Sequence, residues 1–492
     1  MSSCKKVVQV VNLTQNKAPL WEALCAYRKH RIVPFHTPGH KLRADLFPRL
    51  EEQLGSGTFA LDPSDEIESL DFDHDFEAAL EAAQELAAQL FNADNTLFLV
   101  NGTTSGLHYL LYFMSGPVVI PRFSHQSVYT GVMLSGSESI YLPARFDPHW
   151  QIPLQPSPDE FSYHVSGRNP AAAVFTHPTY YGTCGQLADL IQRVHQEGAL
   201  AFVDEAHGGH FHFSRHYPQT ALAAGADGVA QSTHKTLGSL TQTSMLHVRS
   251  KELYQQVKKA RHILETTSPS LVFLAVLDEV RRTLYERGQI LVEDALALAE
   301  GCCAELETIP GVEVLPPHLR SDPTKVVFSL RKLGLTGIQL EGLLRKDYNI
   351  QVELSDYYNV IALITIGDSQ DQVTRLCEAI RLIAKRAGHL GGSALKRPKF
   401  SYPELPEVVF PTGKAVRLPC EVVPLTEAEG RVSGSFVTPY PPGVPLLVPG
   451  ELVSQDTIAY LRWCISLGWP IRGLEGSAPN LALSVIKDNA IC

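Results

Sequence analysis

Several protein classes are excluded by what the 492-residue sequence lacks. Its nine cysteines include no CxxC pair, which is the reduced pattern of an intracellular protein and not a disulfide framework. The N-terminus has no apolar signal core, and no run of eighteen apolar residues occurs. The net charge of −10 leaves no excess of positive charge for binding nucleic acid. We therefore expect a cytoplasmic protein without membrane or nucleic-acid partners.

Two motifs of nucleotide and metal enzymes are incomplete. The letters DEAH at 204–207 occur in the Walker B-type box of some helicases, but the GxxxxGK[ST] phosphate loop of such an ATPase occurs nowhere. The histidines at 207, 210, 212 and 216 could suggest a metal site. However, HExxH is absent, and alternating histidines fit a short strand or turn equally well. We predict no metal site and treat an ATPase as a minor alternative.

The hydrophobic pattern predicts an α/β protein. A content of 44% hydrophobic and 19% charged residues is that of a globular protein with a large core. Strand patterns alternate with helical patterns from about 96 to 250, which predicts a mostly parallel sheet covered on both faces. Long helical patterns at 251–264 and 270–307 lead to four strand patterns, VEVLPP, KVVFSLR, IQVELSD and VIALITIG. Helices near 337–345 and 369–386 complete this smaller α/β unit.

We divide the chain into five parts. They are an N-terminal helical segment (1–33), a large domain (34–300), a small α/β domain (301–388), a linker rich in Gly, Ser and Pro (389–403) and a C-terminal α+β domain (404–492). The first part contains one amphipathic helix at about 18–31. A Leu/Ala period predicts a further helix at 76–91 in the large domain.

Two short segments suggest a pyridoxal phosphate site. AFVDEAHGGH places Asp204 at the end of an apolar strand, and QSTHKTLGSLTQ places Lys235 in a polar loop. Pyridoxal phosphate needs a lysine amine that holds it as a Schiff base, and an acidic partner for its ring nitrogen. Each residue alone has an ordinary alternative, because Asp204 could be a turn residue and Lys235 a solvated charge.

A phosphate-binding turn lies upstream of both segments. TLFLVNGTTSGLHYLL runs from an apolar strand into a polar turn, and a helical pattern starts near Ser105. Backbone N–H groups at a helix start bind anions, and Thr103, Thr104 and Ser105 add hydroxyl donors beside Gly102. The order of phosphate turn, acid and lysine, each at a strand end, favours one shared site.

The chain resembles the Orn/Lys/Arg decarboxylase family of fold-type I pyridoxal phosphate enzymes, especially its shorter bacterial arginine and lysine decarboxylase group. The matching segments follow the family order over nearly the whole chain: PFHTPGHK, FLVNGTTSG, PRFSHQSVYTG, HPTYYG, VDEAHGGHFHF, STHKTLGSLTQ, VELSDYYN and PYPPGVPLLVPGE.

The resemblance implies roles for individual residues. Catalytic roles fall to Lys235, His125, Asp204 and His207. The same four are expected to bind the cofactor, together with Gly102, Thr103, Thr104, Ser105, Ala206, Ser232 and His234. His125 would stack on one face of the cofactor ring, with Ala206 on the other. Glu353 and Asp356 are candidates for the cationic end of a substrate, because a carboxylate pairs with guanidinium or ammonium.

Other implied roles are weaker. His36, His40 and Lys41 are expected near the active site of a homodimer, and the role of His177 is open because the family often has Asn there. The implied reaction is α-decarboxylation of a basic amino acid, most simply arginine to agmatine. Lysine or ornithine decarboxylation, an aminotransferase and a non-catalytic relative are the alternatives.

Overall fold

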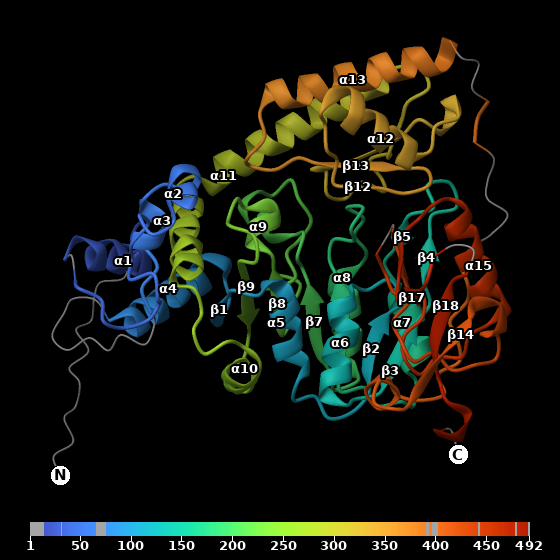
Figure 1. The fold of residues 1–492 in the computed structure, drawn as a ribbon, viewed down its shortest axis with the longest axis horizontal. Coiled ribbons are helices and arrows are strands. Elements are labelled where there is room, and N and C mark those ends of the chain that lie inside the picture. The colour runs from blue at the N-terminus through green and yellow to red at the C-terminus, as the bar shows by residue number, and fades with distance from the viewer. Residues whose placement is uncertain are drawn as a thin grey trace.

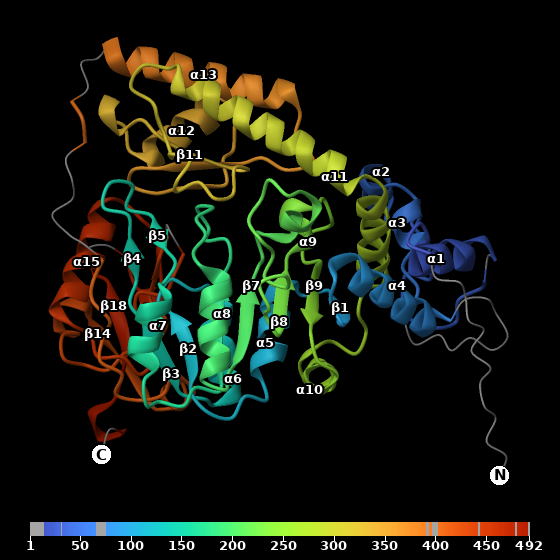
Figure 2. The same cartoon turned by 180° about the vertical axis from the view of Figure 1, so that it is seen from behind.

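The computed structural model describes residues 14–30, 32–64, 75–389, 393–395, 402–440, 443–477 and 480–490. Figures 1 and 2 show a large domain in the middle, a small domain above it and a C-terminal domain at one side, with the N-terminal helices at the other side. The predicted helix at 18–31 is α1 (Pro19–Lys29), and its expected last residue lies outside the described residues. Most of the predicted linker at 389–403 also lies outside them.

A seven-stranded sheet forms the centre of the large domain. Its strands, in spatial order, are β1 (Asn95–Leu99), β9 (Ser244–Val248), β8 (Gly228–Gln231), β7 (Leu200–Asp204), β6 (Ala172–Thr176), β2 (Val118–Pro121) and β3 (Ser139–Leu142). β9 pairs antiparallel with both of its neighbours, and the pairs from β8 to β3 are parallel. The prediction of a mostly parallel sheet is therefore confirmed.

Helices cover both faces of this sheet, because alternate strand residues point to opposite sides. Phe98 of β1 packs in one core with α4 (Phe76–Phe91), α7 (Pro158–Val165), α8 (Leu187–Gln196) and the start of α11 (Leu271–Glu307). Leu97 and Leu99 pack in the other core. The helices of that core are α5 (Gly102–Leu111), α6 (Gln126–Ser135) and α10 (Lys251–Leu264).

The small domain is an antiparallel sheet under two helices. Its strand order is β10 (Glu313–Val314), β11 (Lys325–Ser329), β13 (Val360–Leu363) and β12 (Leu354–Ser355). The helices are α12 (Gly337–Tyr348) and α13 (Gln370–His389). All four strands fall in the segments that the sequence predicts. Helix α11 runs for 37 residues from the large domain into this one, across the predicted boundary at 300.

The C-terminal domain contains short strands and one long helix. Its strands are β14 (Cys420–Pro424), β15 (Thr438–Pro439), β16 (Ile471–Arg472), β17 (Leu474–Glu475) and β18 (Ala482–Ile486), and its helices are α14 (Thr412–Ala415) and α15 (Gln455–Ser466). Short elements elsewhere are α2 (Pro48–Leu54), α3 (Gly57–Ala60), α9 (Thr233–Thr236), β4 (Arg145–Phe146) and β5 (Pro153–Leu154). Single-turn 3₁₀ helices lie at Gly209–Phe213, Arg331–Leu333, Leu425–Glu427 and Asp488–Ala490.

A buried ion pair joins the C-terminal domain to the large domain. Arg122, just after β2, donates to both carboxylate oxygens of Glu451 at 2.6 and 2.8 Å and to the carbonyl of Leu446 at 2.6 Å. Both charged side chains are at most 1% exposed. The Arg122 carbonyl accepts from the Tyr129 hydroxyl at 2.6 Å. Because Arg122 is three residues from His125, this pair ties the C-terminal domain to one edge of the expected active site.

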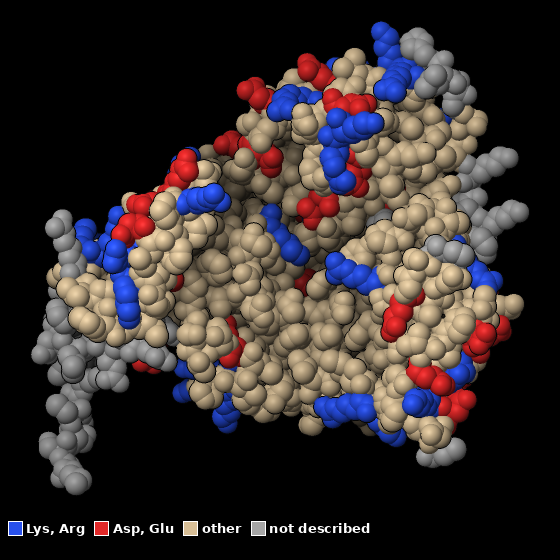
Figure 3. Space-filling model, viewed as in Figure 1, with Lys and Arg blue, Asp and Glu red and all other residues tan. Residues whose placement is uncertain are grey.

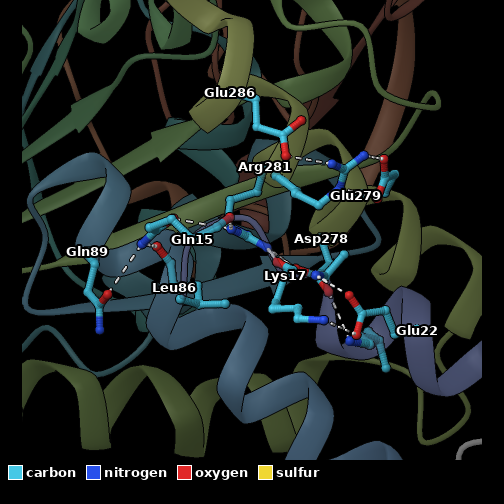
Figure 4. Close-up of polar contacts among 12 residues, drawn as sticks. Gln15, Lys17, Glu22, Leu86, Gln89, Asp278, Glu279, Arg281 and Glu286 are labelled. Atoms are coloured by element: carbon cyan, nitrogen blue, oxygen red, sulfur yellow. Dashed lines mark hydrogen bonds and ion pairs between the residues drawn. The ribbon is translucent and has the colours of Figure 1, made fainter. Parts of the chain in front are cut away.

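A second buried pair attaches the N-terminal segment to α11 (Figure 4). Arg281 and Asp278 are both inaccessible, and the guanidinium donates to the carboxylate at 2.9 Å. Arg281 also donates to the carbonyls of Gln15 and Lys17, and Asp278 accepts from the backbone N–H of Leu20. The start of α1 is thereby fixed to α11 by charged groups whose hydrogen bonds are satisfied.

Charge is unevenly distributed on the face shown in Figure 3. Lys, Arg, Asp and Glu gather over the small domain and the N-terminal helices, and fewer lie over the middle of the large domain. In the part of the chain that the structure describes, no helix combines the length and the apolar character needed to cross a bilayer.

Candidate active site

The predicted site residues meet where strands of the large sheet end. Asp204 is the last residue of β7 and is almost fully buried, and its Oδ1 accepts from the backbone N–H of Ala206 at 3.2 Å. Lys235 lies in α9, directly after β8. Because β7 and β8 are parallel neighbours, the acid and the lysine share one edge of the sheet.

A row of three side chains runs through this edge. His207 Nε2 lies 3.1 Å from Lys235 Nζ, and His207 Nδ1 lies 2.6 Å from Lys325 Nζ. Lys325 is the first residue of β11 in the small domain and is inaccessible to solvent. One imidazole ring therefore bridges amines from two domains.

Burial changes the pKa of every member of this row. Burial lowers the pKa of Lys235 against the opposing effect of the Asp204 and Glu353 carboxylates. Burial likewise lowers the pKa of Lys325 to about 8, although Asp322 and Glu353 favour its charged form. Burial and both lysines hold the pKa of His207 well below its ordinary value, so this ring is neutral at neutral pH.

His125 is the N-cap residue of α6 and lies close to the same charges. Its Nδ1 accepts from the backbone N–H of Ser127 at 3.2 Å and lies 2.7 Å from the Ser127 hydroxyl. Burial lowers its pKa, Asp204 raises it and Lys235 lowers it. Since Nδ1 is occupied as an acceptor, the neutral ring carries its proton on Nε2.

The start of α5 fits the phosphate of pyridoxal phosphate. No side chain caps the first turn, so its N–H groups are free of side-chain acceptors in the described structure. Gly102 has a φ of +70°, and a Cβ placed there would meet no atom within 4 Å. The Thr103 hydroxyl lies 3.2 Å from that of Ser232, the N-cap of α9, so both helix starts face one place. Amides and hydroxyls that can donate to a phosphate, a lysine amine and a carboxylate for the ring nitrogen are the groups that this cofactor requires, and here they are joined by the nearby Lys235 and Asp204.

The remaining cofactor candidates lie around this cradle. Thr104 and Ser105 belong to the first turn of α5, and the Ser105 hydroxyl donates to the Gly102 carbonyl at 2.9 Å. His234 Nδ1 lies 2.8 Å from the Thr243 carbonyl, and burial lowers the pKa of His234.

The two substrate candidates have different surroundings. Glu353 is exposed and accepts from the Tyr180 hydroxyl. Its carboxylate stabilises the charged forms of Lys235 and Lys325. Asp356 accepts from the Tyr181 hydroxyl, from the Asn359 side chain and from two backbone N–H groups at 2.7–2.9 Å. Its four acceptor positions are thus used within the fold, and Glu353 is the carboxylate that faces the lysines.

The structure leaves several predicted residues outside this cluster. His36 contacts the Tyr27 hydroxyl at 3.0 Å, His40 contacts Asp62 at 3.2 Å, and Lys41 donates to the carbonyl of His36. Their expected place at a dimer's active site stays a prediction. His177 Nε2 donates to the Gln219 carbonyl at 3.0 Å, and burial lowers the pKa of His177 to about 4.

The histidines of the HGGHFHFSRH segment do not converge. His210 lies 3.2 Å from Asp322, whereas His212 packs on Phe91. Among the described residues, no group of three or more His, Cys, Asp or Glu side chains has the arrangement of a metal site.

Sequence reasoning missed Lys325 and Tyr180. Lys325 opens an apolar strand pattern, KVVFSLR, where a lysine is typical of a solvated strand end. Tyr180 belongs to the HPTYYG segment, and its ring lies 4.9 Å from that of His207 and 5.3 Å from Lys325 Nζ. The only sequence signal for Lys325 was the DPTK turn before β11. The Asp322 of this turn is buried and acts on the charge of Lys325.

Comparison with known families identifies the family of the chain. The model of the Orn/Lys/Arg decarboxylase major domain matches residues 18–319, and the model of the C-terminal domain of the same family matches residues 406–475. The chain belongs to the Orn/Lys/Arg decarboxylase family. Members of this family are amino-acid decarboxylases, which confirms the predicted enzyme class.

The arginine decarboxylases among the relatives align over nearly their whole length. The arginine decarboxylase of Bacillus subtilis is 34% identical over 97% of this chain and 99% of that protein. The arginine decarboxylase of Bacillus anthracis is 35% identical over 97% and 98%. The lysine decarboxylase LdcA of Pseudomonas aeruginosa is 24% identical over 90% of this chain and 75% of that protein.

Solved structures show the same fold. The constitutive lysine decarboxylase of Escherichia coli superposes with a TM-score of 0.81 at 20% identity, over 96% of this chain and 82% of that chain. A serine palmitoyltransferase of Sphingomonas wittichii superposes with a TM-score of 0.54 at 15% identity, over 76% and 87%. The fold-type I assignment made from the sequence is confirmed, and so is the presence of a C-terminal domain.

Proposed function

We propose that this family member decarboxylates arginine to agmatine and CO₂ with pyridoxal phosphate. The observation that carries the proposal is the meeting of Lys235, Asp204, His207 and His125 at one end of the large sheet. The choice of arginine is supported by the relatives named arginine decarboxylase, which are 33–35% identical, whereas relatives named lysine decarboxylase are 23–24% identical.

The chain would hold the cofactor at three points. The amine of Lys235 would bind it covalently, Asp204 would pair with its ring nitrogen, and the start of α5 with Ser232 would bind its phosphate. Once bound, pyridoxal phosphate supplies an electron sink for the electron pair left when CO₂ departs. His125 and Ala206 would hold the two faces of its ring.

Protein groups then govern charge and protons. The Asp204 carboxylate is buried and held by the Ala206 N–H. Its position beside the cofactor's ring nitrogen would therefore need no reorganisation during the reaction. Lys235, with its lowered pKa, can act as a neutral amine that accepts a proton from the substrate amine. Either the Lys235 ammonium or a protonated His125 would return a proton to the substrate Cα after CO₂ leaves.

Glu353 would bind the guanidinium of arginine. Its carboxylate is exposed near both lysines and is oriented by the Tyr180 hydroxyl. We expect Glu353→Gln to raise KM for arginine by about tenfold or more, because an ion pair is replaced by a hydrogen bond between the guanidinium and an uncharged amide. Steady-state kinetics would measure this, with Glu378→Gln on the exposed side of α13 as the matched control. An unchanged KM would remove Glu353 from the substrate site.

The deciding experiment is CO₂ release by the cofactor-loaded protein on equal concentrations of arginine, lysine and ornithine, with the amine products identified. Agmatine as the main product supports the proposal. Cadaverine or putrescine would support the second candidate, a lysine or ornithine decarboxylase, which the fold match to lysine decarboxylases keeps open. Keto acid without CO₂ would indicate an aminotransferase.

We also propose a cytoplasmic homodimer. The described cysteines are all free, as in a reducing compartment. Large apolar side chains are exposed between residues 33 and 54, including Val33, Phe35 and Leu54, and Phe35 is 93% accessible. A second copy of the chain would cover such a surface. Sedimentation of the purified protein would test this, and a monomer at micromolar concentration would contradict it.

A further inference from the structure

The contact between His207 and two lysines constrains where protons can lie. A neutral imidazole has one N–H donor and one acceptor nitrogen, and a lysine ammonium has only donors. If both lysines were charged, the His207 N–H would point at an ammonium. With the ring neutral and both contacts at hydrogen-bond distance, one lysine must therefore be a neutral amine that accepts from His207.

Three observations favour Lys325 as the charged partner below about pH 8, the value to which burial lowers its pKa. Its contact with His207 is the shorter one, 2.6 Å against 3.1 Å for Lys235, as expected for a donor that carries charge. Its Nζ lies 5.3 Å from the centre of the Tyr180 ring, which favours a cation. Asp322, three residues before it, is a buried carboxylate; burial alone would raise its pKa, but His210 and Lys325 lower it.

We propose that Lys325 is a positioning residue that fixes His207 in the Nε2–H tautomer, so that His207 donates to Lys235 and keeps its amine neutral. This rests on the proposed function only in taking Lys235 as the lysine that binds the cofactor. A neutral amine is the form that attacks a carbonyl and accepts a proton. The arrangement thus prepares Lys235 for its reaction before cofactor or substrate arrives.

The proposal takes account of the other charges around the row. Asp204 from β7 and Glu353 before β12 favour a charged Lys235, and His125 faces both Asp204 and Lys235. Lys325 counteracts the effect of these carboxylates on Lys235 in two ways. Its own positive charge disfavours a charged Lys235, and the His207 tautomer that it fixes favours the neutral amine. Because Lys325 belongs to the small domain and Lys235 to the large one, the state of the amine depends on how the two domains are joined.

The first test reads the tautomer directly in the full-length chain freed of cofactor. Nitrogen-15 NMR of histidine-labelled protein distinguishes a protonated Nε2 from a protonated Nδ1, and the His207 signals are assigned by their loss in His207→Phe. The proposal expects Nε2 protonated and Nδ1 unprotonated at pH 7, below the value of about 8 to which burial lowers the pKa of Lys325. A protonated Nδ1 would overturn it. This test needs no variant of Lys325, so it holds even if such variants fold poorly.

The second test measures the reactivity of Lys235 against pH. Reductive methylation of the cofactor-free protein, read by peptide mass spectrometry, gives the pH at which Lys235 becomes reactive, with Lys258 on α10 as the internal standard. We expect Lys325→Met to move this pH upward by about one unit, which is roughly a tenfold loss of reactivity at a fixed lower pH. Lys325→Arg, which keeps the cation, should retain most of the wild-type behaviour.

A double variant separates the tautomer from a direct effect of charge. In a His207→Phe background, Lys325→Met should move the profile less than it does in the wild type. An equal shift in both backgrounds, or no shift in the wild-type background, would overturn the proposal. These readouts do not involve turnover. Protein that lacks decarboxylase activity but has the expected tautomer would support this inference and reject the proposed reaction.

Discussion

Substitution of Glu451 by Gln should destabilise the attachment of the C-terminal domain. The change keeps the volume of the side chain but removes its charge, and Arg122 remains buried without a counterion. The amide of a Gln side chain has one accepting oxygen, and its NH₂ group presents N–H donors to a guanidinium that can only donate. The cost of leaving one member of a buried ion pair unpaired is about 3–5 kcal/mol.

This loss should be visible as a separate unfolding transition. Trp463 and Trp469 lie in the core of the C-terminal domain, so Trp21→Phe and Trp150→Phe in the background would leave fluorescence that reports on this domain alone. With a urea dependence of about 1–3 kcal/mol per molar, a loss of about 3–5 kcal/mol moves the midpoint down by about 1–5 M. In the variant, the C-terminal domain should therefore unfold at a lower urea concentration than the large domain.

A second variant tests the cause. Replacing both partners by apolar residues, as in Arg122→Met with Glu451→Leu, removes the buried charge altogether and should recover most of the lost stability. The reasoning is refuted if Glu451→Gln leaves the midpoint unchanged, or if the double variant is less stable than the single one. The second result would mean that the hydrogen bonds of Arg122 matter more than its charge.

Three further predictions concern the edge of the sheet. Lys235→Ala should abolish turnover and remove the absorbance of bound cofactor, and a yellow, active variant would contradict the site. Asp204→Asn should keep the fold, checked by circular dichroism, and lower kcat about 100-fold or more, because a charge fixed next to the reacting group is lost; near-normal turnover would argue against this role. Burial raises the pKa of Glu205 to about 8, so the folded state holds a proton that the unfolded state releases near pH 4.5. The contribution of this group to stability should therefore fall as the pH rises from about 5 to about 8. The melting temperature of Glu205→Gln should lack that part of the pH dependence. If the melting temperatures of the variant and the wild type depend on pH in the same way, this role of Glu205 is excluded.

Local signals predicted most of the fold. The helix expected at 76–91 is α4 (Phe76–Phe91), and those expected at 251–264 and 270–307 are α10 and α11, with one end differing by one residue. These helices have long apolar periods and clear starts, such as the Asp75 and Ser250 side chains that cap α4 and α10. The sequence could not single out β9 as the antiparallel strand, because its apolar pattern is the same in either direction.

The site was predictable only where its residues are close in sequence to a strand end. Asp204 and Lys235 follow buried strands, so their position at one sheet edge follows from the topology. Lys325 reaches the same place from another domain, 90 residues further along, and no periodicity links it to His207. Three of the four hydrogen bonds that occupy Asp356 come from Tyr358 and Asn359 in its own turn, and only the tertiary bond from Tyr181 joins distant parts of the chain.

Helix α11 determines how this enzyme can admit its substrate. Its 37 residues extend for about 55 Å as one uninterrupted hydrogen-bonded rod that is anchored at one end by Asp278 and Arg281 and packed in the small domain at the other. The small domain cannot swing as a lid without bending this rod. Lys325 and Glu353 of the small domain are consequently held at a fixed distance from Lys235 of the large domain. Glu353, the proposed partner of the guanidinium, is therefore in place before substrate binds, so little binding energy is spent on assembling the site.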